Sequence, residues 1–159
     1  MKTIEEQIRA MEAQWPGFKL ISQADDRSAE WQGVLAPDKR EHVVRIRYRV
    51  PMVLENITLK DVQPRVQVLR PLLEWHADYE QGPIPHVYAS HADPKLPYLC
   101  LFSPAGREWG TGDFISDTTV FWAAEWLYFY EGWLVTKKWR GGGQHVGRTA
   151  DGVKQLETV

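Results

Sequence analysis

The feature that most constrains the fold is a nearly uncharged run near the C-terminal end of the chain. Between residues 120 and 135 the only charged residues are Glu125 and Glu131, and three of the others are tryptophan. A helix that is apolar nearly all round must be buried on most sides or must dock onto another surface. The run is too short and too aromatic to cross a bilayer, which takes about 20 apolar residues. It predicts a buried central helix, whose start either Ser116 or Asp117 can cap.

The residues before this helix predict a sheet. From Val44 onward, residues 42–50 alternate apolar and basic side chains, which is the pattern of a half-buried antiparallel strand. Three further runs, at 18–22, 30–35 and 66–73, are bounded by turn residues and predict three more strands. We expect a four-stranded antiparallel meander. The arginines at 45, 47 and 49 share one face of their strand, where they are either simply solvated or dock an acidic partner surface.

A first helix is predicted over residues 3–14, where apolar residues recur at intervals of three and four. Thr3 can cap it, and Glu6 stands three residues later, as in a capping box. The pair Pro16-Gly17 ends it. Strands flanked by helices in this order predict the α+β class, with the helices packed on one antiparallel sheet.

The stretch between the last strand and the second helix is rich in proline. Four prolines fall within residues 83–97, and because proline removes a backbone donor, we expect residues 75–97 to form an ordered loop rather than sheet. Cys100, the only cysteine of the chain, lies just beyond it in the short apolar run 98–102. A single cysteine cannot form an internal disulfide or a Cys-rich zinc site.

Composition excludes several classes of protein. The formal net charge is −2, so the chain lacks the basic excess with which proteins bind nucleic acid or an anionic membrane. The polar start, residues 1–9, has no signal-peptide pattern, and we expect a cytoplasmic protein. Eight tryptophans are many for 159 residues; they supply either core mass or an interface with a partner, and both interpretations are open.

A family resemblance rests on a set of short motifs in the second half of the chain. These are Pro85-His86-Val87-Tyr88, Leu96 to Phe102, Pro104, Glu108-Trp109, Thr118-Thr119, Trp122, Glu125-Trp126-Leu127, Tyr130-Glu131, Trp133 and Trp139 to His145. Together with the order of elements, they resemble the prokaryotic ubiquitin-conjugating (UBC) relatives of the cyclic-oligonucleotide antiphage signalling systems (CBASS). The motifs cover residues 84–145, and before them only the element order matches.

The resemblance implies a fold and a function. It implies a UBC-like conjugating domain over residues 1–147, followed by a polar C-terminal tail at 148–159, in a stand-alone form without a fused activating domain. It also implies that the cysteine carries, as a thioester, the C-terminal glycine of a cGAS-like nucleotidyltransferase, which primes cyclic-nucleotide synthesis. A separate activating enzyme is a possible further partner. No cofactor, metal, nucleic acid or membrane is expected.

Cys100 is the residue to which the resemblance assigns the thioester. The thiolate is the attacking species, and a free cysteine has a pKa of about 8.5. Eukaryotic conjugating enzymes carry a His-Pro-Asn motif upstream of the cysteine, whereas this chain has His86-Val87-Tyr88 and lacks the proline and asparagine. Tyr88, His91 and His145 are candidates for the missing donor or for a proton acceptor. Cys100 could instead be a small buried apolar residue, and His86 could have only a structural role.

Three alternative functions remain open from the sequence. The first is a non-catalytic UBC-like adaptor that only binds its partner. The second is a Cys–His hydrolase that uses Cys100 with His86 or His145, although no hydrolase signature surrounds the cysteine. The third is a metal protein with ligands from His76, His86, His91 and Asp93, which lack a compact ligand spacing.

Overall fold

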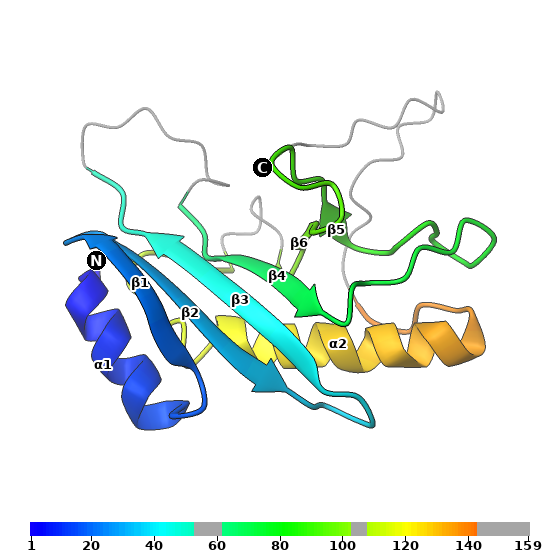
Figure 1. Cartoon of the computed structure of the whole chain (residues 1–159), viewed down its shortest axis with the longest axis horizontal. Helices are drawn as coiled ribbons and strands as arrows, with labels where there is room; N and C mark the ends of the chain where they lie inside the picture. Colours follow the sequence, from blue (N-terminus) through cyan, green and yellow to red (C-terminus); the bar gives the residue numbers. More distant parts are fainter. Residues whose placement is uncertain (53–61, 103–107, 143–159) are drawn as a thin grey trace.

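The computed structural model describes residues 1–52, 62–102 and 108–142. Within these ranges the chain is an α+β protein with an N-terminal helix, a four-stranded antiparallel sheet and a C-terminal helix (Figure 1). The elements are α1 (Ile4–Gln14), β1 (Lys19–Asp25), β2 (Ser28–Leu35), β3 (His42–Arg49), β4 (Arg65–Arg70), β5 (Val87–Tyr88), β6 (Tyr98–Leu99) and α2 (Thr119–Thr136). Neither helix combines the length and apolar character that a membrane crossing requires.

The main sheet is the predicted meander, with strand order β1-β2-β3-β4 and every pair antiparallel. Along β3, His42, Val44, Ile46 and Tyr48 are buried, while the three arginines between and after them lie on the other face. The period-two pattern therefore predicted this strand correctly. The bounds of the other strands differ from the predicted ones by a few residues: β1 continues to Asp25, β2 begins at Ser28, and β4 ends at Arg70, before Pro71.

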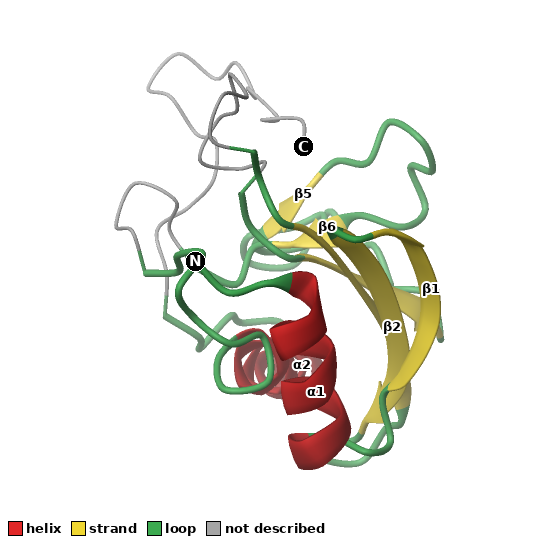
Figure 2. Cartoon of the chain, turned by 90° about the vertical axis from the view of Figure 1, so that its left-hand side faces the viewer, coloured by secondary structure: helices red, strands yellow, loops and turns green. Residues whose placement is uncertain are grey.

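Both helices lie on one side of the sheet (Figure 2). The predicted capping box of α1 is present: the Glu6 backbone N–H donates to Thr3 Oγ1 over 3.2 Å, and the Thr3 N–H donates to Glu6 Oε2 over 2.8 Å. Two donors that would otherwise have no partner in the helix are thereby satisfied. In the part of the chain that the structure describes, no helix covers the opposite face of the sheet.

The core lies between the sheet and α2. Val120, Ala123, Leu127 and Trp133 of the helix are fully buried, as is Trp31 on the inner face of β2. Burial of a valine or leucine side chain stabilises the fold by about 1.5–3 kcal/mol. Five of the eight tryptophans are buried in all, at positions 31, 109, 126, 133 and 139, so most of them serve the core.

The second helix is not buried all round. Phe121, Tyr128 and Val135 follow one another at seven-residue intervals, and their exposed fractions are 48%, 54% and 83%. A spacing of seven residues returns to the same side of a helix. The sequence predicted burial on most sides or docking onto another surface; in the isolated chain α2 is buried along one side and leaves an apolar side in solvent.

The predicted cap of α2 is wrong. The helix begins after Thr118 rather than after Ser116 or Asp117, and the Thr118 side chain makes no capping hydrogen bond. Its hydroxyl instead donates to the Phe114 carbonyl over 2.7 Å and accepts a hydrogen bond from Trp109 Nε1 over 3.1 Å. A tertiary partner, the Trp109 indole, therefore decides where this threonine points, and a sequence pattern does not report such a contact.

The prediction that the proline-rich stretch contains no sheet is also wrong in part. Val87 pairs with Leu99 and Tyr88 pairs with Tyr98, which makes a short antiparallel ribbon of β5 and β6. The prolines lie outside the paired residues, so they do not remove a ladder donor. Strands of two residues are too short to show a period, which is why the sequence did not reveal them.

Candidate active site

The short ribbon of β5 and β6 positions the cysteine. Beyond the two paired residues, the Cys100 backbone N–H donates to the His86 carbonyl over 2.9 Å, which extends the ladder by one residue. Because side chains alternate across a strand, Tyr88, Tyr98 and Cys100 belong to the same face of the ribbon. The ribbon therefore brings together residues that are twelve positions apart in the sequence.

Tyr88 and Cys100 meet across this ribbon. Tyr88 is paired with Tyr98, so Cys100 is its diagonal neighbour, a distance that an aromatic side chain can bridge. Cys100 Sγ donates to Tyr88 Oη over 3.2 Å and lies 3.9 Å from the Phe102 carbonyl oxygen. The cysteine as a whole is half-buried. A phenol is donor and acceptor alike, and it can donate to the sulfur once the thiol ionises.

A backbone carbonyl ties the site to α2. The His86 carbonyl accepts a second hydrogen bond, from Trp126 Nε1 over 3.1 Å, in addition to the one from Cys100. His86 has a φ of 49°, in the left-handed region, which costs a non-glycine residue about 1–2 kcal/mol. Its ring packs against Trp139 with centroids 5.2 Å apart. The two hydrogen bonds and this packing hold the residue in that conformation, so its backbone has a structural role.

A buried glutamine ties the other strand of the ribbon to the main sheet. Gln67 of β4 is 2% exposed; it accepts a hydrogen bond from Arg45 Nη2 over 2.7 Å and donates to the Leu96 carbonyl, just before β6. The sequence reasoning did not single out Gln67 or Trp126 as site residues. The only signal for Gln67 was a polar residue inside the apolar run 66–73, and Trp126 lay among the motif residues on the helix that was predicted to be buried.

The remaining candidates are placed as follows. His91 is exposed in the connection between β5 and β6. His145 lies outside the described residues, as does the whole predicted tail at 148–159. His76 stacks on Tyr79 with centroids 4.2 Å apart. Within the described part of the chain, no three histidine, cysteine, aspartate or glutamate side chains cluster in a way that could hold a metal, so the proposed ligand set is not brought together.

Comparison with known proteins decides the family. The sequence model of the family described as type II CBASS E2 protein matches residues 7–146, which include Cys100 and the entire ribbon. The chain belongs to this family. The resemblance inferred from the motifs is thereby confirmed, and the matching region also extends it to the first helix and the sheet. No curated protein matches this CBASS E2 protein.

Proposed function

We propose that this CBASS E2 protein has the UBC fold and acts as an acyl carrier through Cys100. The fold proposal is supported by the order of its elements: a helix, a four-stranded meander, a cysteine-bearing segment and a second long helix. The function proposal is supported by family membership, since E2 denotes the conjugating-enzyme class. The observation that carries the proposal is the half-buried Cys100 beside Tyr88 Oη, on a ribbon held by hydrogen bonds to α2 and to β4.

The chemistry is a transfer of an acyl group between sulfurs. The Cys100 thiolate attacks the carbonyl carbon of a donor's C-terminal residue, which is activated as a thioester on another protein, and a new C–S bond forms. The old C–S bond breaks, and the leaving thiolate takes up the proton that Cys100 gave up. Sulfur is intrinsically nucleophilic, so a modest thiolate fraction is sufficient for this step.

Tyr88 takes the part of the donor that the missing asparagine would supply. Of the three candidates, it is the one with a described contact to the sulfur, while His91 lies in an exposed connection. Its hydroxyl donates a hydrogen bond to the thiolate and lowers the cost of forming the charge. A hydrogen bond to an ionised group contributes about 1.5–3 kcal/mol.

The acyl donor in this proposal is the C-terminal glycine of the cGAS-like nucleotidyltransferase of the same system. Loading of this glycine on Cys100 primes the nucleotidyltransferase for cyclic-nucleotide synthesis. An activating enzyme supplies the activated carboxyl group. The resemblance of the motifs implies these partners, and membership of the CBASS E2 family supports the link to that system.

The test is intact-protein mass spectrometry of the chain co-expressed with the nucleotidyltransferase and the activating enzyme of its system, with and without a thiol reductant. We expect a covalent species at the summed mass less one water, which disappears with reductant and is absent from Cys100→Ala. Cys100→Ser should either trap the adduct as a reductant-resistant oxyester or abolish it. A reductant-sensitive adduct on the serine variant would refute the assignment to Cys100.

The same experiment addresses the adaptor alternative. A stable non-covalent complex without an adduct would favour an adaptor that only binds its partner. Tyr128→Phe is a matched control for the site variants, because Tyr128 is 54% exposed on the outer side of α2. That variant should form the adduct as the unaltered chain does.

A further inference from the structure

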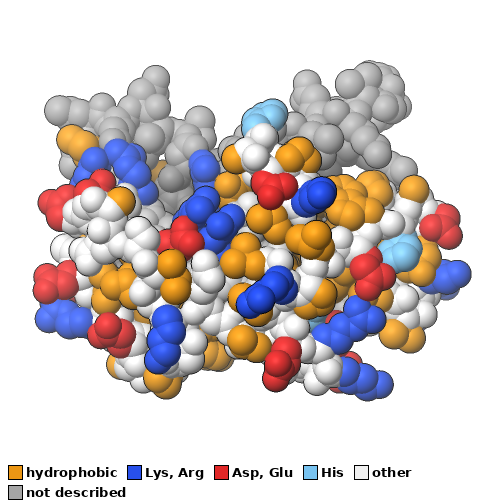
Figure 3. All heavy atoms as spheres, in the orientation of Figure 1, with side chains coloured by type: hydrophobic (Ala, Val, Ile, Leu, Met, Phe, Trp, Pro, Cys, Tyr) orange, Lys and Arg blue, Asp and Glu red, His pale blue; other side chains and the backbone are white. Residues whose placement is uncertain are grey.

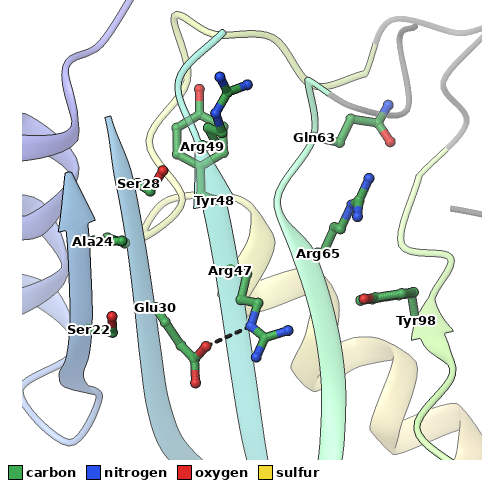
Figure 4. A pocket seen from close by; sticks show the side chains of 11 residues that line it. Ser22, Ala24, Ser28, Glu30, Arg47, Tyr48, Arg49, Gln63, Arg65 and Tyr98 are labelled. Carbon is green, nitrogen blue, oxygen red and sulfur yellow. Dashed lines mark hydrogen bonds and ion pairs between the residues drawn. The ribbon is translucent and has the colours of Figure 1, made fainter. Parts of the chain in front are cut away.

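The two sides of the molecule expose different side chains. Over the face of the sheet that no described helix covers, acidic and basic side chains lie beside one another (Figure 3). Arg47, Arg49 and Arg65 line a groove of about 470 Å³ there, in which Arg47 Nε lies 2.6 Å from Glu30 Oε2 (Figure 4). The outer side of α2, which faces away from the sheet (Figure 2), is mainly apolar instead.

The exposed side of α2 forms a seam with the spacing of a helix–helix contact. The members of this α2 seam are all exposed and follow one another in alternating steps of four and three: Phe121, Glu125, Tyr128, Gly132 and Val135. These steps are those of the a and d positions with which one helix packs against another. Glu125 is the one charged member, because Glu131, the other acidic residue of the helix, is buried against His42. The seam therefore suits a second helix.

The α2 seam is complementary to itself when two copies run in opposite directions. With the two Tyr128 residues at a two-fold axis, Phe121 lies opposite the partner's Val135, so that apolar side chains meet apolar side chains. Glu125 lies opposite the partner's Gly132, where even a Cβ would meet nothing within 4 Å, so the carboxylate has room to reach solvent. A parallel pair in register would instead bring the two Glu125 carboxylates together, and like charges at such close positions destabilise a helix pair.

The charges at the two ends of α2 favour the same antiparallel arrangement. Asp117 is exposed just before the helix, and Lys138 is exposed just after it. In the antiparallel pair centred on Tyr128, Asp117 of each copy comes to lie beside the partner's Lys138, which gives two pairs of opposite charges. The helix dipoles also oppose each other in this arrangement, with the positive N-terminus of one helix beside the negative C-terminus of the other. A parallel pair would place like charges together at both ends.

We propose that the α2 seam binds the α2 seam of a second copy of this chain, antiparallel and about a two-fold axis at Tyr128. The inference does not depend on the proposed carrier function. From Phe121 to Val135 the seam is about 21 Å long, and with a helix about 10 Å wide it covers roughly 200 Å². A stable complex buries about 800 Å² per partner. The pair is therefore weak and reversible, with a dissociation constant on the order of 100 μM.

The experiment is sedimentation velocity of the full chain at concentrations from about 5 to about 500 μM, on either side of the expected dissociation constant. The sedimentation coefficient should rise from that of a monomer towards that of a dimer. Tyr128→Glu/Val135→Glu should remain monomeric throughout, because it places carboxylates on the seam. Ile21→Glu/Val34→Glu is the matched control, since Ile21 and Val34 on the sheet are 53% and 52% exposed; it should dimerise as the unaltered chain does. A monomer at every concentration, or a control that dimerises no better than the seam variant, would overturn the proposal.

Tyr128→Phe keeps the ring that packs at the two-fold axis and should also dimerise normally. The alkylation and adduct assays use dilute protein, in which the dimer is scarcely populated.

A charge exchange tests the direction of the pair. Asp117→Lys and Lys138→Asp each place like charges side by side at both ends of the dimer, and each should weaken dimerisation about fivefold at low salt. The combined variant Asp117→Lys/Lys138→Asp restores opposite charges in an antiparallel pair and should recover the original affinity. A combined variant as weak as the single ones would refute the antiparallel arrangement.

The nucleotidyltransferase is the other candidate occupant of the α2 seam. If the chain alone stays monomeric and Tyr128→Glu/Val135→Glu abolishes a non-covalent complex with the nucleotidyltransferase, the seam belongs to that partner and the self-pairing proposal fails. Dimerisation through the seam without any adduct on Cys100 would leave this proposal standing and overturn the carrier function alone.

Discussion

Replacement of Tyr88 with phenylalanine removes one oxygen atom from the site and leaves the aromatic ring in place. The lost atom is the one that lies 3.2 Å from Cys100 Sγ. Hydrogen bonds to ionised groups contribute about 1.5–3 kcal/mol, and because sulfur is a weak partner we take about 1 kcal/mol. Since 1.4 kcal/mol corresponds to a factor of ten, this loss lowers the thiolate fraction about fivefold at neutral pH.

The assay is the rate at which iodoacetamide alkylates the protein, followed by intact mass. Cys100 is the only cysteine, so every alkylated molecule reports on this thiol. Tyr88→Phe should react about fivefold more slowly than the unaltered chain at neutral pH, and the two rates should converge at alkaline pH, where both thiols are ionised. Tyr128→Phe, on the exposed side of α2, should react as the unaltered chain does.

Two results would refute this reasoning. Equal alkylation rates at neutral pH would show that the Tyr88 hydroxyl does not stabilise the thiolate. A rate that is reduced by the same factor at every pH would indicate a change in access to the sulfur rather than in its ionisation. In either case the proposed replacement of the missing asparagine by Tyr88 would fail.

Three further predictions concern the framework of the site. Gln67→Leu removes the hydrogen-bond partner of the Leu96 carbonyl and of the Arg45 guanidinium. This variant should lower the free energy of unfolding by about 2 kcal/mol in urea titrations, and it should slow adduct formation. An unchanged adduct rate would contradict the positioning role of Gln67. Burial opposes ionisation of Glu131, but hydrogen bonds from the Lys39 backbone and from His42 outweigh it and hold the Glu131 pKa below its ordinary 4.5. The Glu131 carboxylate therefore stabilises the fold above pH 4.5, and this stabilisation is lost as the pH falls below the lowered pKa. Glu131→Gln should lower the free energy of unfolding by about 3 kcal/mol at neutral pH and by progressively less in acid. A loss of stability that does not depend on pH would contradict this prediction. Gly33→Ala would place a Cβ 2.5 Å from the Phe18 ring and should destabilise the protein by about 1–3 kcal/mol. In α2, the Cβ of Gly132→Ala would meet nothing within 4 Å, and this variant should stabilise the protein by about 0.5–1 kcal/mol. Thermal unfolding of the two variants should therefore shift in opposite directions.

The local patterns of the sequence predicted the elements that depend on nearby residues. The capping box of α1 involves two residues three positions apart, Thr3 and Glu6, and it is present. The alternation along β3 predicted both its existence and which side chains face the core. These features are decided within one element, so they can be read before the tertiary structure is known.

The misplaced features depend on hydrogen bonds that the local sequence patterns do not report. Thr118, and not Ser116 or Asp117, precedes α2, and its hydroxyl makes no cap because Trp109 and Phe114 engage it. The ribbon of β5 and β6 consists of two-residue strands, which have no periodicity of their own. In both cases the outcome is fixed by hydrogen bonds whose partners the sequence does not indicate.

The sequence by itself determined the fold class, the family and the presence of a single thiol in the chain. Only the tertiary structure decided that Tyr88 contacts Cys100, that the His86 backbone holds both Cys100 and Trp126, and that arginines from separate strands line one groove. The physical reason is the pairing register of the strands. A shift by one residue would turn Tyr88, Cys100 and the groove arginines to the opposite face of their strands.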